Sequence, residues 1–234
     1  AVIIVISILF KKNPMSLFAG LGATSAILML VFKDTIEGLV AGIRLTSNEM
    51  VHLGDWITVP GTPVDGNVVD ISLTTVKVQQ FDKTYTTISP LTLVNGTFKN
   101  WKGMQESGMR QVVKKIYFDV RSIRLLTDET RQNLTNKKMV SQKDMEGEVV
   151  NIGLFRHYIE TYLRKREDVN KSATLLVHQL EATQNGLPIE IIFFLNTTNG
   201  IEFENKISDI LEHVYAYVNE FGLQIYEGLS VTNK

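Results

Sequence analysis

The sequence predicts a membrane α-helical segment, then a small all-β barrel or sandwich domain, then an α+β C-terminal domain. Three observations predict this order. Residues 15–32 form an uncharged apolar run, short runs rich in β-branched residues begin after Val51, and strand and helix patterns alternate from Met109 onward. With 234 residues, the chain has room for two modest domains, or for one domain with an anchor.

Composition and motifs exclude several classes of protein. The net charge of -1 gives no basic field that would indicate a nucleic-acid partner. The absence of cysteine excludes disulfides, thiolate zinc sites and a cysteine nucleophile. The four histidines are isolated, and the chain has no HExxH motif, Walker loop or GxSxG elbow. We therefore predict a protein that is not an enzyme, with no catalytic residues, no metal and no cofactor.

Residues 1–12 are predicted to be the end of a truncated transmembrane helix. The first ten residues hold a single polar member, Ser7, and ten residues are too few to cross a bilayer. The run lacks the basic start and the small-residue cleavage site of a signal peptide. Charge and an Asn-Pro turn signal at residues 11–14 then break it.

Residues 13–47 are predicted to form a transmembrane helix with a bend and then an interfacial helix. As a helix, residues 15–32 would cover roughly 27 Å, close to the hydrocarbon thickness of a bilayer. Lys33 and Asp34 end this uncharged run. Residues 35–46 continue as a second helical piece, whose apolar stripe suits the membrane interface. The alternative is a helix that simply continues into the first soluble domain.

Small residues recur at helical spacing within the apolar run. Ser16, Gly20 and Thr24 are four residues apart, as are Gly22 and Ala26. In lipid this spacing lets helix backbones approach closely, which a lone anchor does not need. Helices packed in this way can ring an axis, and apolar side chains facing that axis close a pore by dewetting. One helix cannot enclose a pore, so this interpretation requires a cyclic homo-oligomer.

Residues 48–108 are predicted to form the β domain. Four runs rich in β-branched residues are separated by turn residues, and they lie at residues 56–59, 64–71, 74–79 and 84–88. A domain of this size should depend on its neighbours for stability.

Residues 109–234 are predicted to form the α+β domain, with helices on one face of a mixed sheet. Strands are expected at residues 112–120, 173–180 and 189–195. Helices are expected at residues 122–133, 152–166 and 202–221, with a lysine-rich loop at 133–147. We expect Asn151 to cap the second helix, Asn185-Gly186 to form a hairpin turn and Gly222 to close the third helix.

An ordered set of segments resembles the MscS-like family of small-conductance mechanosensitive channels. The matching segments are the Gly/Ala-rich helix at 15–32, LVAGI at 39–43, LGDWI at 53–57, GNVVDI at 66–71 and residues 89–96. Residues 155–164 and 186–191 resemble the longer miniconductance (YbdG-type) branch. The resemblance covers nearly the whole chain.

This resemblance implies a homoheptamer in the bacterial inner membrane, with the β and α+β domains forming a cytoplasmic cage. The function that it implies is an ion channel opened by membrane tension, which protects the cell against hypoosmotic shock. The implied partners are membrane lipid, permeating ions and small solutes, and further copies of the chain.

The resemblance also assigns the pore-lining residues, which fall on Ala19, Gly22, Ala23, Ala26 and Leu30. The family closes its pore with two leucine rings, which align with Ala26 and Leu30. Leu30 keeps the leucine character and Ala26 does not. The seal is therefore looser in this chain or is shifted to a neighbour such as Leu21 or Ile27.

The bend is assigned in the same way. The bend glycine of the family falls on Asp34, which departs from the pattern. Gly38 and Gly42 form a GxxxG pair close by and are the alternative hinge residues.

Two other interpretations stay open at this point. The helix could be only a tether for a membrane-anchored cytoplasmic binding module, although the small-residue stripe counts against this. The chain could also be a membrane-bound enzyme, for which no residue set stands out. The oligomeric mass in detergent separates these interpretations from a channel, because a monomer excludes a pore.

Overall fold

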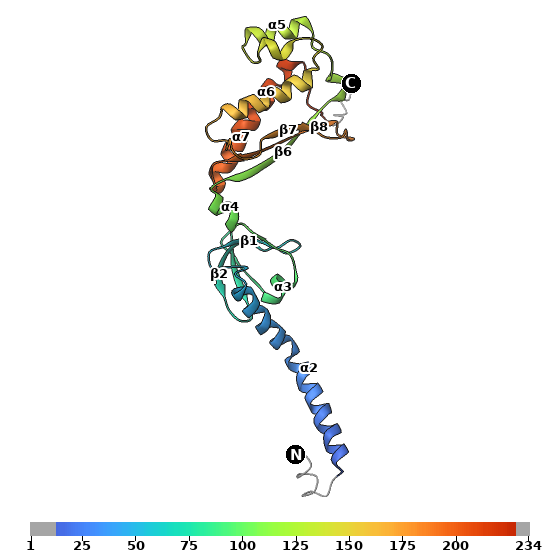
Figure 1. The fold of residues 1–234 in the computed structure, drawn as a ribbon, viewed down its shortest axis with the longest axis vertical. Helices are drawn as coiled ribbons and strands as arrows, with labels where there is room; N and C mark the ends of the chain where they lie inside the picture. Colours follow the sequence, from blue (N-terminus) through green and yellow to red (C-terminus); the bar gives the residue numbers. More distant parts are fainter. Residues whose placement is uncertain (1–12, 228–234) are drawn as a thin grey trace, which may run out of the picture. The chain divides into compact units, whose positions relative to one another are not determined.

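The structure is a computed structural model that describes residues 13–227 (Figure 1). The chain divides into two compact units, Ala1–Gly103 and Met104–Lys234. The predicted end of a transmembrane helix at residues 1–12 lies outside the described residues.

The first unit begins with α2 (Pro14–Ser47), one unbroken helix of 34 residues. The Asn13 side chain caps it by accepting the Met15 N–H at 3.0 Å. Lys33 and Asp34, after which the sequence predicts a second helical piece, lie inside this helix, because neither residue interrupts a helix. Lys33 instead pairs with Glu37 one turn later, at 3.9 Å across the expected junction. Each glycine inside the helix lowers helix stability by only about 1 kcal/mol relative to alanine, and the helix propensity of the other residues compensates for this.

The strands of the first unit form one antiparallel sheet in the order β4-β3-β2-β1-β5. Four of them lie where the β-branched runs predict them, and they are β1 (Trp56–Thr58), β2 (Asp65–Ile71), β3 (Val76–Gln80) and β4 (Tyr85–Ile88). The sequence did not predict the short elements α3 (Pro90–Asn95), β5 (Lys99–Asn100) and α4 (Lys102–Ser107). The side chains of Val76 and Val78, two residues apart on β3, point into a buried core. Leu45 of α2 packs into the same core.

The second unit has a three-stranded sheet in the order β6-β8-β7. Its strands are β6 (Arg110–Phe118), β7 (Leu176–Gln179) and β8 (Leu187–Leu195), and both pairings are antiparallel. The expectation of a mixed sheet is therefore wrong for the described strands. The helices α6 (Asn151–Lys165) and α7 (Gly200–Tyr217) cover one face of the sheet, as expected (Figure 1).

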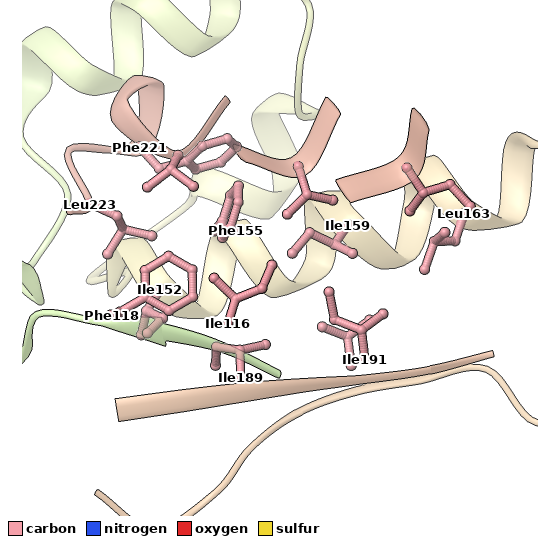
Figure 2. Packing of buried hydrophobic residues seen from close by; sticks show 14 of the residues in the cluster. Ile116, Phe118, Ile152, Phe155, Ile159, Leu163, Ile189, Ile191, Phe221 and Leu223 are labelled. Atoms are coloured by element: carbon pink, nitrogen blue, oxygen red, sulfur yellow. The ribbon is translucent and has the colours of Figure 1, made fainter. Parts of the chain in front are cut away.

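The core of the second unit lies between these helices and the sheet. Figure 2 shows Phe155, Ile159 and Leu163 of α6 pointing toward Ile189 and Ile191 of β8. These five side chains are buried, at 1% exposure or less. The opposite side of α6 is therefore left for other contacts.

The helix expected at residues 122–133 begins later than predicted, because its capping residue is Thr127. The Thr127 side chain accepts the Thr130 N–H and starts α5 (Asp128–Asn136). Before it lie the one-turn helix η1 (Val120–Ser122) and a bridge between Leu125 and Val150. The loop expected at residues 133–147 contains a further short turn, η2 (Gln142–Met145), which Ser141 caps.

Asn151 does not act as the helix cap that the sequence predicts. It is the first residue of α6 and is 1% exposed, and the preceding residue makes no side-chain cap. Its amide donates to the carbonyl oxygens of Ser122 (2.9 Å) and Phe221 (3.2 Å), and its Oδ1 accepts the Arg124 N–H (3.1 Å). The Asn151 side chain therefore links the start of α6 to residues 122–124 and to Phe221 by hydrogen bonds.

Two turn predictions in this unit are confirmed. Asn185-Gly186 lies in the hairpin between β7 and β8, where Gly186 adopts a φ of 91° and pairs with Thr183. Gly222 ends η3 (Val218–Phe221), the short turn that follows α7, with a φ of 65°.

A cluster of aromatic rings lies between α6 and α7. His213 stacks on Tyr162 with ring centroids 3.8 Å apart, and its Nε2 lies 2.8 Å from the Tyr158 hydroxyl. Burial, followed by the nearby Arg166 charge, lowers the pKa of His213 below its ordinary value of 6.5. Burial, helped by Tyr217 and Tyr162, raises the pKa of Tyr158 to about 12. The cluster is therefore built around a neutral histidine at neutral pH.

We expect acid to destabilise this cluster through His213. Below pH 6.5 the unfolded chain binds a proton at this residue more readily than the folded chain does. The free energy of unfolding therefore falls as the pH drops through that range. Replacing His213 with glutamine should reduce the loss of amide protection in α7 between about pH 7.5 and about pH 5.5. Hydrogen exchange of the two proteins at matched pH measures this difference.

Titration of four carboxylates in this unit does not account for the loss of stability in that pH range. The pKa values of Asp144, Asp168, Glu202 and Glu220 are all held below their ordinary values by hydrogen bonds, so these groups titrate at lower pH. An equal loss of protection in the two proteins would contradict the role of His213.

Candidate functional site

The outstanding feature of α2 is its exposed apolar surface. It is the one described helix that is long and apolar enough to cross a membrane, and its most apolar stretch of 18 residues has no buried side chain. Met29 and Leu30 are each 74% exposed. Moving a side chain of this kind out of water is worth about 1.5–3 kcal/mol, so a surface of this length needs a cover.

The five predicted pore-lining residues share one face of α2. Successive residues of an α-helix are rotated by about 100°, which places all five within a sector about 100° wide. This face, which we call the small-residue face, consists of Ala19, Gly22, Ala23, Ala26 and Leu30. Leu30 is the one bulky side chain among these five, and Met15 falls in the same sector at the start of α2. Leu21 and Ile27, the alternative positions for a seal, lie outside this sector.

The opposite side of α2 is bulky. Leu21, Leu28, Phe32 and Leu39 lie within a sector about 40° wide on that side, and each is at least 40% exposed. The helix therefore has one smooth face and one bulky apolar face. Smooth faces let helices approach closely, whereas bulky apolar faces suit lipid.

Charged residues continue the small-residue face beyond Leu30. Lys33 and Glu37 follow at spacings of three and four residues and point within the same sector. Their side chains are 60% and 47% exposed and form the pair at 3.9 Å. In the sequence, Lys33 marks only the end of an uncharged run. The spacing from Leu30 to Lys33 and Glu37 was the signal that could have identified them.

The three hinge candidates have different surroundings in the structure. Asp34 is exposed, and Gly38 has open space where a Cβ would lie. Gly42 is buried, and a Cβ there would lie 2.6 Å from the carbonyl oxygen of Leu73 in the turn between β2 and β3. With Ala41 (2% exposed) and Leu45 (0%), Gly42 holds the end of α2 against the β domain. Their role as hinges stays a prediction.

Replacing Gly42 with alanine should destabilise the β domain. The added methyl group meets a backbone carbonyl that cannot rotate away, and overpacking of this kind costs about 1–3 kcal/mol. Both tryptophans of the chain, Trp56 and Trp101, lie in this unit, so thermal unfolding followed by tryptophan fluorescence reports on it. We expect a lower unfolding temperature.

Gly38 provides the matched control for this substitution. It lies one turn earlier on the same helix, and nothing stands within 4 Å of the Cβ position. Replacing Gly38 with alanine should leave the unfolding temperature unchanged or raise it. The corresponding gain in the free energy of unfolding is at most about 1 kcal/mol, because alanine favours a helix more than glycine does. Equal unfolding temperatures for the two variants would contradict the close contact at Gly42.

The described residues hold no group of three or more His, Asp or Glu side chains that could bind a metal. His52, His157 and His178 each lie beside a single carboxylate, from Asp55, Asp144 and Glu190 respectively.

The β domain and the end of α2 are similar to known proteins. Residues 34–103 match the family model described as the mechanosensitive ion channel β-domain. The small-conductance mechanosensitive channel MscMJ of Methanocaldococcus jannaschii is 33% identical over 85 residues, which is 36% of this chain and 24% of that protein. The low conductance mechanosensitive channel YnaI of Escherichia coli is 21% identical over 228 residues, which is 94% of this chain and 57% of that protein.

The fold is similar beyond the β domain. The crystal structure of Helicobacter pylori MscS in a closed state superposes with a TM-score of 0.67 at 17% identity, covering 99% of this chain and 78% of that one. The chain thus has an MscS-like fold with a helix, a β domain and a C-terminal domain. It spans 24% and 57% of the length of the two curated relatives above.

Proposed function

We infer that this chain belongs to the MscS-like family of mechanosensitive channels and is part of an ion channel opened by membrane tension. The proposal depends most on one observation, which is the two-sided surface of α2. A smooth face that ends in a bulky Leu30, opposite a bulky apolar face, is what a helix needs to line a pore and contact lipid at once. The match of residues 34–103 to the mechanosensitive ion channel β-domain model supports the same conclusion.

In this proposal, α2 of several identical subunits surrounds a shared axis. The small-residue faces point toward the axis, and Leu30 forms the narrowest apolar ring. Membrane tension favours the state with the larger area in the membrane plane, so tension shifts the population toward the open state. Membrane lipid, ions and small solutes are then the partners of the chain, and other copies of the chain complete the pore.

The finer features of the proposal follow the resemblance in the sequence. We propose a homoheptamer of the miniconductance (YbdG-type) branch, in the bacterial inner membrane, with the β and α+β domains in the cytoplasm. Its role would be to release solutes during hypoosmotic shock. The family consists of channels, which supports a protein that is not an enzyme.

Two measurements on the full-length protein test the proposal. Mass determination in detergent should give a ring of several subunits, and a monomer would exclude the pore. Suction on patches of liposomes containing the protein should then produce stepwise currents that liposomes without protein lack. A membrane-anchored binding module would give no current at any tension.

A further inference from the structure

A groove lies on the outer side of α6, away from the sheet. Its larger lobe has a volume of about 630 Å³, and an adjoining lobe of about 390 Å³ shares Lys138, Met139, Tyr158, Thr161 and Lys165 with it. The groove is bounded by α6, by the residues after α5 and by the end of α7 with η3. Both volumes lie within the range of small-molecule sites, and rigid helices supply most of the walls.

One wall of the groove is aromatic and held in place. Tyr158, Tyr162 and Tyr217 line it, and the rings of Tyr158 and Tyr217 are 5.7 Å apart. Tyr158 is fixed by its hydrogen bond to His213, and the Tyr162 hydroxyl accepts one from Arg166 at 2.8 Å. Such a wall offers a ready surface for a flat ring to stack on.

The groove also has positive charge that its two carboxylates, Glu220 and Asp144, do not neutralise. Asp144, in the smaller lobe, accepts a hydrogen bond from the Ser141 hydroxyl at 2.6 Å and lies 3.5 Å from His157. Glu220 accepts hydrogen bonds from Lys137 at 2.6 Å and from Asn133 at 2.8 Å, so its charge is already satisfied. Lys138 and Lys165 form no ion pair with any residue in the described range 13–227. Two ammonium groups without an ion pair, besides the paired Lys137, therefore line the groove beside the tyrosines, with Thr161 also in its lining.

We propose that this groove binds a nucleoside phosphate, with the base on the tyrosine wall and the phosphates between Lys138 and Lys165. Only a ligand with both a flat ring and a compact anion uses both halves of the lining. An inorganic anion would use the lysines alone, and an uncharged nucleoside would use the tyrosines alone. The inference concerns the C-terminal unit and does not depend on the proposed channel.

The test is calorimetric titration of the purified full-length protein with ADP, adenosine and inorganic pyrophosphate. ADP should bind at one saturable site per chain, at least about ten-fold more tightly than either adenosine or pyrophosphate. Added ADP should also protect backbone amides at residues 137–139 and 158–165 from hydrogen exchange in the unmodified protein. This second measurement does not depend on any variant being folded.

Matched lysine variants locate the phosphate. Lys138→Gln and Lys165→Gln should each weaken ADP binding at least about ten-fold. Lys171→Gln removes the same charge from an exposed lysine outside the groove and should leave the affinity unchanged. The proposal is overturned if ADP does not bind, if pyrophosphate or adenosine binds as tightly, or if Lys171→Gln weakens binding as much as the groove variants do.

Discussion

Replacing Leu30 with serine should lower the membrane tension at which the proposed channel opens. In the proposed pore, Leu30 is the bulky member of the small-residue face and keeps water out of the narrowest ring. Each serine removes roughly 2 kcal/mol of apolar free energy, and the loss is repeated in every subunit of the ring. The closed pore then wets more readily. Patch recordings under graded suction measure the threshold directly.

Leu28 gives the matched control for Leu30. It lies on the opposite, bulky face of the same helix, two residues away, and is 52% exposed compared with 74% for Leu30. Leu28→Ser makes the same chemical change away from the proposed axis, so its effect on the threshold should be much smaller. Equal thresholds for the two variants would remove Leu30 from the role of gate.

Neutralising Lys33 or Glu37 should change the ion preference of the channel in opposite directions. Both side chains continue the small-residue face, so in a ring they lie around the pore next to Leu30. Rings of charge attract the opposite ion and can change local ion concentrations about ten-fold or more. Lys33→Gln leaves the Glu37 ring uncompensated and should favour cations. Glu37→Gln leaves the Lys33 ring and should favour anions.

Reversal potentials in asymmetric KCl measure this preference. The double variant, with glutamine at both positions, restores a neutral ring and should return close to the preference of the unmodified channel. If the channel conducts but the single variants leave the reversal potential unchanged, then Lys33 and Glu37 do not face the pore. If no current flows in the unmodified protein, the proposed function itself fails.

Local patterns in the sequence predict the regular elements well. The β-branched runs locate β1 to β4, and the helical spacing of Leu154, Phe155, Tyr158 and Ile159 locates α6. The sequence does not predict β5, with two residues, or α3, with six, because such short elements show no period. The pattern before α6 predicts a cap at Asn151, and the structure differs because the three partners of Asn151 come from segments far away in the chain.

The candidate site could be predicted only in part. The small-residue face follows from spacing alone, since helix geometry fixes which residues share a side. The sequence leaves the continuity of α2 through Lys33 and Asp34 open, because charge next to an apolar run resembles a helix end although neither residue breaks a helix. The different surroundings of Gly38 and Gly42 depend on the position of the Leu73 carbonyl, which no local pattern contains.

The way α2 is held at one end has a mechanical consequence. The buried contacts at Ala41, Gly42 and Leu45 fix the position of the C-terminal end of α2 on the β domain. The part of the helix that precedes these contacts, from Pro14 to Val40, is about 40 Å long. A tilt of about 5° at these contacts would move the N-terminal end of α2 by about 3–4 Å over that length. Substitutions in the turn around Leu73 are therefore expected to change the tilt of α2 without altering any side chain along it.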